Sequence, residues 1–179
     1  MSDIVTAEVK TPLRPLDKEG LDNLVVGAKE NPTEVKTLKI KTVCEGKFRN
    51  LNYARDLPVQ VVDEPPGLLG ENTAQNPSEI LLSALGSCLS VGIHANARAK
   101  GIELTKLELE LEGDINITSV WGINDSSQAP LGITDVRIKA HVEGNASKEE
   151  LAELVAHANQ WSPISNTVRN PVNLEVELA

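Results

Sequence analysis

The stretch NPSEILLSALGSCLSVGIHANARAKGI, residues 76–102, predicts one long apolar helix with a cysteine, Cys88, near its middle. Asn76 can cap the first turn of this helix, and Glu79 follows it by three residues, as in a capping box. Gly101 marks the end of the helix, because glycine readily adopts the left-handed conformation that follows a last helical turn. Apolar side chains face most directions around the axis, so we expect this helix to be the buried spine of the fold.

A second helix is predicted to begin at Ser147, where Glu150 completes another capping box. Pro163 ends or kinks this helix, because proline cannot continue the backbone hydrogen bonding. We also expect a helix to approach the first one closely just before Cys88, where four residues are small. They are Ser83, Ala84, Gly86 and Ser87.

Alternation of apolar and polar residues predicts strands on both sides of the first helix. The predicted strands before it cover residues 37–44, 48–55 and 58–65, and a loop rich in turn-forming residues leads from them into the helix. The predicted strands after it cover residues 104–117, 136–144 and 172–178, with a long connection over 118–134. This order of elements predicts an α+β fold with antiparallel sheet.

Residues 1–34 differ in composition from the rest of the chain. Three prolines, Pro12, Pro15 and Pro32, surround one short predicted helix there. The segment is too short to form a domain by itself, so we interpret it as an N-terminal arm that packs on the domain or on a partner subunit. The remaining residues, 35–179, suit one domain in length.

Composition argues against several classes of protein. The formal net charge is −9, so no basic surface indicates binding to nucleic acid or to an anionic membrane. We expect no apolar stretch of the length that spans a bilayer, and the first residues lack the pattern of a signal peptide. Two cysteines, Cys44 and Cys88, do not make a disulfide scaffold. These observations predict a soluble cytoplasmic protein.

No motif for a metal or a cofactor is found in the sequence. The three histidines, His94, His141 and His157, lie far apart and do not have the spacing of metal ligands. The chain has neither a glycine-rich phosphate loop nor a G-x-S-x-G nucleophile elbow. We therefore expect no metal and no cofactor.

The chemistry of Cys88 depends on what surrounds it, because a buried cysteine usually packs as a small apolar side chain. The middle of a helix gains nothing from the helix dipole, so a reactive thiolate here needs a cation from elsewhere in the fold. Cys44 is expected to pack on the inward face of its strand, beside Ile40. The arginines that can supply the cation are Arg49, Arg55, Arg98 and Arg169.

Two segments of the chain, residues 63–90 and 158–178, together resemble the OsmC/Ohr family, named after osmotically inducible protein C and organic hydroperoxide resistance protein. The first family motif is an Asn-Pro at a helix start with a cysteine twelve residues after the asparagine, and Asn76 and Cys88 match it. The second motif is a helix that ends in Cys-Pro-Val-Ser before a final strand. The likeness extends from about residue 33 to the end of the chain and is closer to the broad OsmC-like branch.

This resemblance implies a fold in which curved antiparallel sheets pack around two long helices in an intertwined homodimer, with the active site at the subunit boundary. It also implies a thiol peroxidase. The first cysteine of the family attacks a hydroperoxide as a thiolate and becomes a sulfenic acid, and the second then forms a disulfide with it. A thiol reductant resets the enzyme, and an arginine and a glutamate near the helix start orient the thiolate.

The chain departs from the family pattern at two positions. Ser162 stands where the family has its second cysteine, so the two-cysteine cycle cannot run in this chain. Cys44 would have to lie within about 7 Å of Cys88, measured between Cα atoms, to take its place. Ser78 stands where the resemblance implies glutamate, and Glu79 comes one residue later, about 100° around the helix.

The main hypothesis is a one-cysteine peroxidase that reduces organic or other hydroperoxides and is reset by an outside thiol. Ser162 would then hydrogen-bond to the sulfur. The proposed catalytic residues are Cys88, Arg55, Glu79 and Ser162. Arg49 is the second choice for the family's arginine, after Arg55.

The alternative hypothesis is a non-catalytic dimeric binding module in which Cys88 lines an apolar pocket for a small ligand. The other lining residues would be Leu68, Leu69 and Trp161. A third hypothesis, acyl transfer by Cys88, ranks last because no oxyanion hole or base is evident in the chain.

Overall fold

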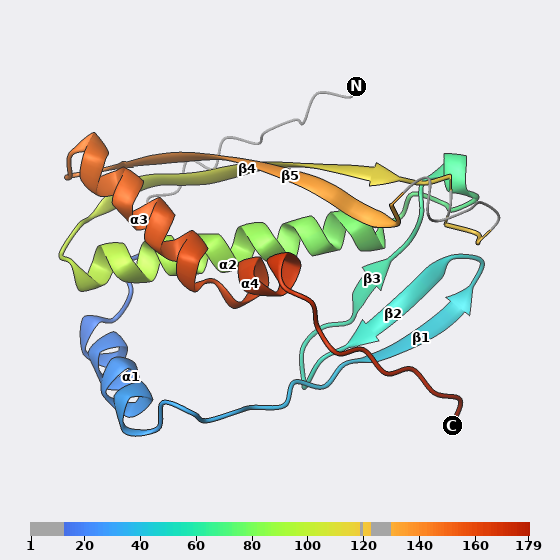
Figure 1. Cartoon of the computed structure of the whole chain (residues 1–179), viewed down its shortest axis with the longest axis horizontal. Helices are drawn as coiled ribbons and strands as arrows, with labels where there is room; N and C mark the ends of the chain where they lie inside the picture. Colours follow the sequence, from blue (N-terminus) through green and yellow to red (C-terminus); the bar gives the residue numbers. More distant parts are fainter. Residues whose placement is uncertain (1–12, 119, 123–129) are drawn as a thin grey trace.

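A computed structural model describes residues 13–118, 120–122 and 130–179 (Figure 1). Residues 1–12 of the predicted arm and eight residues of the predicted connection over 118–134, 119 and 123–129, lie outside the described residues. The helices and strands, in chain order, are α1 (Lys18–Glu30), β1 (Lys41–Gly46), β2 (Arg49–Tyr53), β3 (Gln60–Val62), a 3-10 turn (Pro66–Leu68), α2 (Pro77–Ala99), β4 (Leu104–Asn116), β5 (Gly132–Gly144), α3 (Lys148–Trp161) and α4 (Pro163–Arg169).

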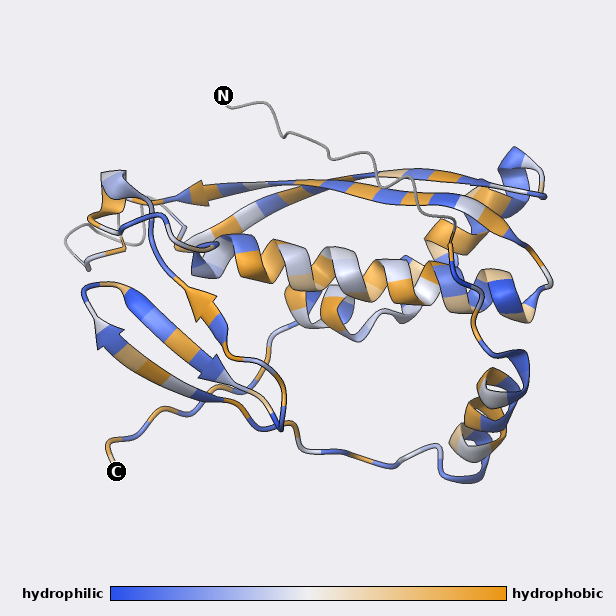
Figure 2. Ribbon diagram, turned by 180° about the vertical axis from the view of Figure 1, so that it is seen from behind, coloured by the Kyte–Doolittle hydropathy of each residue, from blue (hydrophilic) through white to orange (hydrophobic). Residues whose placement is uncertain are grey.

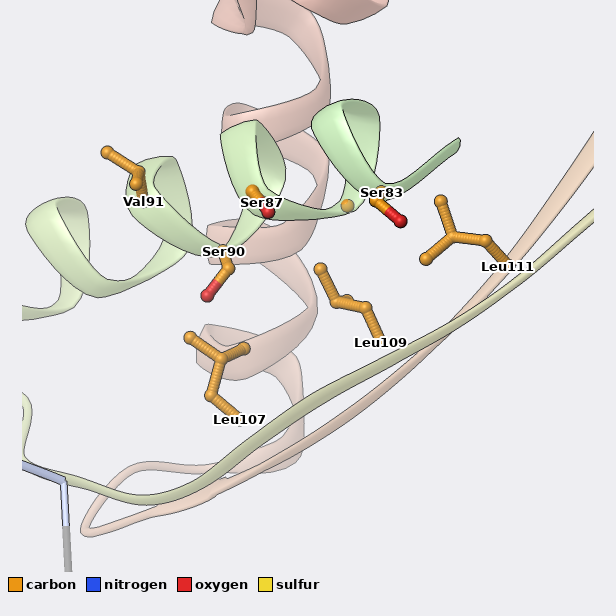
Figure 3. A pocket seen from close by; sticks show the side chains of 8 residues that line it. Ser83, Ser87, Ser90, Val91, Leu107, Leu109 and Leu111 are labelled. Carbon is orange, nitrogen blue, oxygen red and sulfur yellow. The ribbon is translucent and has the colours of Figure 1, made fainter. Parts of the chain in front are cut away.

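The predicted α+β class is confirmed, and the strands form two antiparallel sheets. One sheet has the order β1-β2-β3, and the other is the long β4–β5 hairpin. The hairpin runs along α2, α3 crosses α2, and the three-stranded sheet stands off to one end (Figure 1). Apolar and polar residues alternate along the hairpin (Figure 2). Leu107, Leu109 and Leu111 point toward α2 (Figure 3), and the glutamates between them are exposed.

Helix α2 has the ends that the sequence predicts. The backbone N–H of Glu79 donates to Oδ1 of Asn76 at 2.8 Å, and the N–H of Asn76 donates to Oε2 of Glu79 at 2.9 Å. Gly101 follows the helix with a φ of 75°, which is the left-handed conformation. Helix α3 likewise begins with the predicted capping box between Ser147 and Glu150.

The core lies between α2, α3 and the start of β4. Its buried residues are Ile93, Ala97, Leu104, Leu154 and Ala158. The expectation that α2 is buried all round is wrong, because Val91 is 69 % exposed and Leu81 is 44 % exposed. Within the described residues, α3, α4 and β4 cover only part of the helix surface.

The close helix approach occurs at Gly92, one turn after Cys88, and not before it. A Cβ at Gly92 would lie 3.1 Å from the Cβ of Ala158 on α3. At Gly86 the near neighbour is a strand residue, Leu111, whose Cδ1 would lie 2.9 Å from such a Cβ. The small residues around Cys88 therefore allow two close approaches: β4 packs against Gly86, before Cys88, and α3 packs against Gly92, after it.

The expectation that no apolar stretch could span a bilayer is also wrong in terms of length and composition. Helix α2 has 23 residues and is apolar enough to meet that test. A core helix can pass the same test, and α2 buries Leu85, Leu89, Ile93 and Ala97 against the rest of the chain.

Two predicted strands are not found as expected. Within the described residues, the first has no layer that covers it and the last has no strand to pair with. All of β1 is exposed, so the prediction that Cys44 packs inward beside Ile40 is wrong. Residues 171–179 form no strand, because no neighbouring backbone is present to pair with them. The apolar side chains of this tail are exposed by 64 % to 100 %; they are Val172, Leu174, Val176 and Leu178.

The described part of the arm contacts the body of the molecule through the segment before α1 and through α1 itself, which lies close to α2. Leu13 packs against the core, and Nε of Arg98 donates to the carbonyl oxygen of Leu16 at 2.9 Å. Helix α1 itself has no buried residue. The division into an arm and a domain remains a prediction.

Candidate functional site

The structure brings Cys88 of α2 and Ser162 together, although they are 74 residues apart in the sequence. The hydroxyl of Ser162 donates a hydrogen bond to Sγ of Cys88 at 3.1 Å. Ser162 is buried, with 4 % of its surface exposed, and Cys88 is half-buried. Cys88 is therefore partly accessible as a residue, and its sulfur is hydrogen-bonded to Ser162.

Local sequence fixes the orientation of Ser162. Pro163 cannot continue α3, so the backbone turns extended at Ser162 and α4 begins directly after it. Ser162 caps α4, because the N–H of Ser165 donates to its Oγ at 3.0 Å. Since the oxygen already accepts this hydrogen bond, its own hydrogen is free to point at the sulfur of Cys88.

Glu79 caps α2 and does not contact Cys88 within the chain. Nine residues of helix separate the two, which corresponds to about 13.5 Å along the axis. The carboxylate of Glu79 is occupied by the backbone N–H of Asn76. Its predicted catalytic role stays a prediction.

No hydrogen bond in the described residues joins one of the four candidate arginines to Cys88. Arg55 lies exposed in the turn after β2, with a φ of 50°, and makes no hydrogen bond or ion pair within the described residues. The other three have partners elsewhere: Arg49 contacts Glu45 and Thr73, Arg98 contacts Leu16, and Arg169 contacts Asn159.

Asp63 is a residue that sequence reasoning missed, and it holds the loop that leads into α2. Only 1 % of its surface is exposed, and its carboxylate accepts from the N–H of Thr73 at 3.0 Å and from the Thr73 hydroxyl at 2.7 Å. The N–H groups of Glu64 and Glu71 also donate to it. These hydrogen bonds, those of Thr73 first, lower the pKa of Asp63 to about 2. The sequence feature that could have indicated Asp63 is its position directly after the apolar end of a predicted strand.

Glu64 follows Asp63 and has the opposite character. Burial, followed by the nearby carboxylates of Glu79 and Asp63, raises the pKa of Glu64. Its Oε2 is buried without a hydrogen-bond partner in the described part of the chain. The start of α2 therefore carries three carboxyl groups in different environments.

Cys88 lines none of three cavities that border the helices and sheets of the described residues. One of about 550 Å³ separates α2 from β4, where leucines of the strand point toward Ser83, Ser87 and Ser90 (Figure 3). One of about 540 Å³ lies between the three-stranded sheet and the start of α2. The third, of about 820 Å³, is bounded by α2, the hairpin, α3 and α4.

The predicted pocket residues Leu68, Leu69 and Trp161 line none of these three cavities. Leu69 is 76 % exposed and Trp161 is 68 % exposed. The Trp161 ring packs beside that of His157, with 6.2 Å between the ring centroids. A pocket built from these residues remains a prediction.

Comparison with known proteins gives one family match. Residues 70–177 match the family model described as OsmC-like protein. This range includes both Cys88 and Ser162. A search of the curated proteins found no match.

Solved structures with the same fold include an OsmC-like protein from Mycoplasma pneumoniae, with a TM-score of 0.64 and 19 % identity over 76 % of this chain and 89 % of that chain. An organic hydroperoxide resistance protein OsmC from Legionella pneumophila has a TM-score of 0.56 and 22 % identity over 76 % and 92 %. One from Elizabethkingia anophelis has a TM-score of 0.59 and 19 % identity over 76 % and 91 %. These likenesses show that the chain has the fold of these structures.

Proposed function

The chain belongs to the OsmC-like protein family, and from that premise we propose that it is a thiol peroxidase that reduces organic hydroperoxides through one cysteine, Cys88. The hydrogen bond from Ser162 to the sulfur of Cys88 carries this proposal. Two of the structural neighbours, those from Legionella pneumophila and Elizabethkingia anophelis, are described as organic hydroperoxide resistance proteins, which supports the substrate class.

In the first step the thiolate of Cys88 attacks the distal oxygen of the hydroperoxide ROOH. The sulfur–oxygen bond forms, the oxygen–oxygen bond breaks, and the alkoxide leaves as ROH after it takes up a proton. Cys88 is oxidised to a sulfenic acid and the hydroperoxide is reduced. The Ser162 hydroxyl stabilises the thiolate by donating to it, and hydrogen bonds to charged groups are stronger than neutral ones.

The second step needs a thiol from outside the chain. Ser162 has no sulfur to form a disulfide, and Cys44 is an exposed free thiol on β1, in the sheet away from α2. A thiol reductant R′SH condenses with the sulfenic acid to give a mixed disulfide and water. A second R′SH then releases Cys88 as a thiol and leaves as R′SSR′. Such reductants are available in a reducing cytoplasm, where we place the protein.

The cation for the thiolate comes, in this proposal, from Arg55 of a second subunit in a homodimer. Arg55 is exposed in the turn after β2 and has no hydrogen-bond or ion-pair partner among the described residues. A guanidinium near the thiolate would favour its charged form. Glu79 would orient that guanidinium from the start of α2.

Sulfenic acid trapping tests the proposed chemistry. The full chain is treated with one equivalent of cumene hydroperoxide in the presence of dimedone, and its intact mass is measured. We expect one adduct in the wild-type protein and in Cys44→Ser, and none in Cys88→Ser. An adduct that depends on Cys44 instead of Cys88 would exclude the proposal.

A further inference from the structure

The cavity of about 820 Å³ between α2, the hairpin, α3 and α4 combines an apolar wall with a small polar group of residues. Leu89, Ile93, Val136, Ile138 and Val155 are among the apolar side chains that line it. Its polar lining residues are Thr134, Asn159, Ser165 and Arg169. Its volume lies within the range of about 300–1,000 Å³ that is usual for small-molecule sites.

Two polar side chains of the lining, one buried and one exposed, are available to a ligand, and the buried one, Ser165, is the first. It is 4 % exposed, and its hydroxyl oxygen has no hydrogen-bond partner in the described part of the chain. A buried hydroxyl normally finds a partner, because leaving it unpaired costs free energy. A ligand atom in the cavity can supply one.

Arg169 is the second. It lies four residues after Ser165, one turn further on the same face of α4. Its Nη2 donates to the backbone and side-chain oxygens of Asn159, which are both neutral, and no carboxylate among the described residues pairs with it. A guanidinium has five N–H donors and prefers a carboxylate, which it can bind with two parallel hydrogen bonds.

We infer that this cavity binds a carboxylate with a linear alkyl tail, of the size of a medium-chain fatty acid. The carboxylate pairs with Arg169 and accepts from the Ser165 hydroxyl. The tail lies along the leucine, isoleucine and valine side chains between α2 and β5, and each buried methylene adds to the affinity. Cys88 does not line the cavity, so the inference does not rest on the proposed peroxidase function, although the N–H of Ser165 donates to the Ser162 Oγ that contacts Cys88.

Titration calorimetry with sodium decanoate, below its micelle concentration, tests this site in the full chain. We expect saturable binding with one decanoate per chain and much weaker binding of 1-decanol and of acetate. Arg169→Gln should weaken decanoate binding about tenfold or more, and Ser165→Ala should weaken it by less. Val136→Trp should abolish it by filling the cavity.

Arg137→Gln is the matched control. Arg137 lies on the same strand as Val136 but is exposed, and its guanidinium pairs with Asp114 and Glu112. This variant should bind decanoate as the wild type does. Chemical shift changes confined to the cavity residues of wild-type protein, including Ser165 and Arg169, would locate the ligand even where a variant fails to fold.

Three results would overturn the inference. The first two are no saturable binding of decanoate and equal binding of decanoate and 1-decanol. The third is decanoate binding that disappears as the chain dimerises, because a second copy of the chain would then fill the cavity. Cys88→Ser separates this inference from the proposed function. It should bind decanoate normally while it loses reaction with hydroperoxide. Decanoate binding and the reaction with hydroperoxide are separate measurements, so a negative result in one does not decide the other.

Discussion

At the scale of single residues, Ser162 differs from a cysteine by one atom, and that atom decides what the pair with Cys88 can do. The serine hydroxyl can donate a hydrogen bond to the sulfur of Cys88 but cannot form a disulfide with it. The contact of 3.1 Å is also short enough that a sulfur in place of the oxygen would be within reach of Cys88.

Ser162→Cys is therefore expected to form an intramolecular disulfide with Cys88 under mild oxidation. Intact mass under non-reducing conditions would show the loss of two hydrogens, and peptide mapping would show which thiols are joined. Adding Cys44→Ser controls for a disulfide that involves the other cysteine. Failure of the double variant to form the bond would contradict the observed geometry.

Asp63 gives a prediction about pH. Its pKa is about 2 in the folded protein against an ordinary value of 3.8, so folding stabilises its charged form. This stabilisation is fully present above about pH 4 and is lost as the pH falls through 4 toward 2. Asp63→Asn should unfold more easily at pH 7 and should lose less stability than wild type between pH 4 and pH 2. Urea unfolding at several pH values checks this, and an unchanged acid dependence would contradict it.

The sequence was sufficient to predict the Cys88–Ser162 pair but not the surroundings of Cys88. The resemblance to the family implied this pair, because its two motifs include Cys88 in the middle of α2 and Ser162 directly after α3. The partner of Arg55, by contrast, depends on where a whole sheet lies. No local pattern carries that information, and Asp63 was missed for a related reason: its partners Glu71 and Thr73 lie across a loop.

At the scale of elements, capping and alternation predicted α2, α3 and the strands of the hairpin, while burial was predicted less well. The face of α2 that carries Ile93 is covered by α3, yet Val91 two residues earlier is mostly exposed. An apolar residue in a sequence predicts that a surface will be covered but does not say by which chain. The tail over 172–178 shows the same limit, because its alternation predicts a strand but cannot supply the neighbouring strand.

Helix α3 should be strongly stabilised by Leu154, which is fully buried between α2 and the hairpin. Leu154→Ala should lower the free energy of unfolding by about 2–5 kcal/mol, because it removes apolar contacts and leaves a cavity. Denaturant unfolding followed by circular dichroism measures this. Glu153→Ala, on the exposed side of the same helix, is the control; it removes only an exposed ion pair with Lys100 and should change stability by less than about 1 kcal/mol.

At the scale of the whole molecule, the single chain leaves much apolar surface uncovered. Both β1 and the tail after α4 are exposed, and so are parts of α2. Large exposed apolar patches usually mark an interface. A homodimer in which each chain covers these surfaces of the other would account for the exposed face of β1 and for the predicted strand over 172–178 that has no pairing partner among the described residues.

Light scattering coupled to gel filtration should therefore give about twice the chain mass of 19.3 kDa. Deleting residues 171–179 should shift the protein toward monomer or aggregate, because the proposed dimer interface loses the contacts of this tail. Deleting residues 1–12 is a comparison of similar size at the other end. A wild-type protein that stays monomeric at micromolar concentration would contradict the proposed dimer.

The most direct test of the central claim is the rate at which Cys88 reacts with cumene hydroperoxide, followed by stopped flow in the Cys44→Ser background. We predict a second-order rate constant at least about a hundredfold above that of a free thiol at the same pH, and a loss of about tenfold or more in Ser162→Ala, since a hydrogen bond to a charged group contributes about 1.5–3 kcal/mol. A Cys88 that reacts no faster than a free thiol, with or without the Ser162 hydroxyl, would contradict the proposed peroxidase.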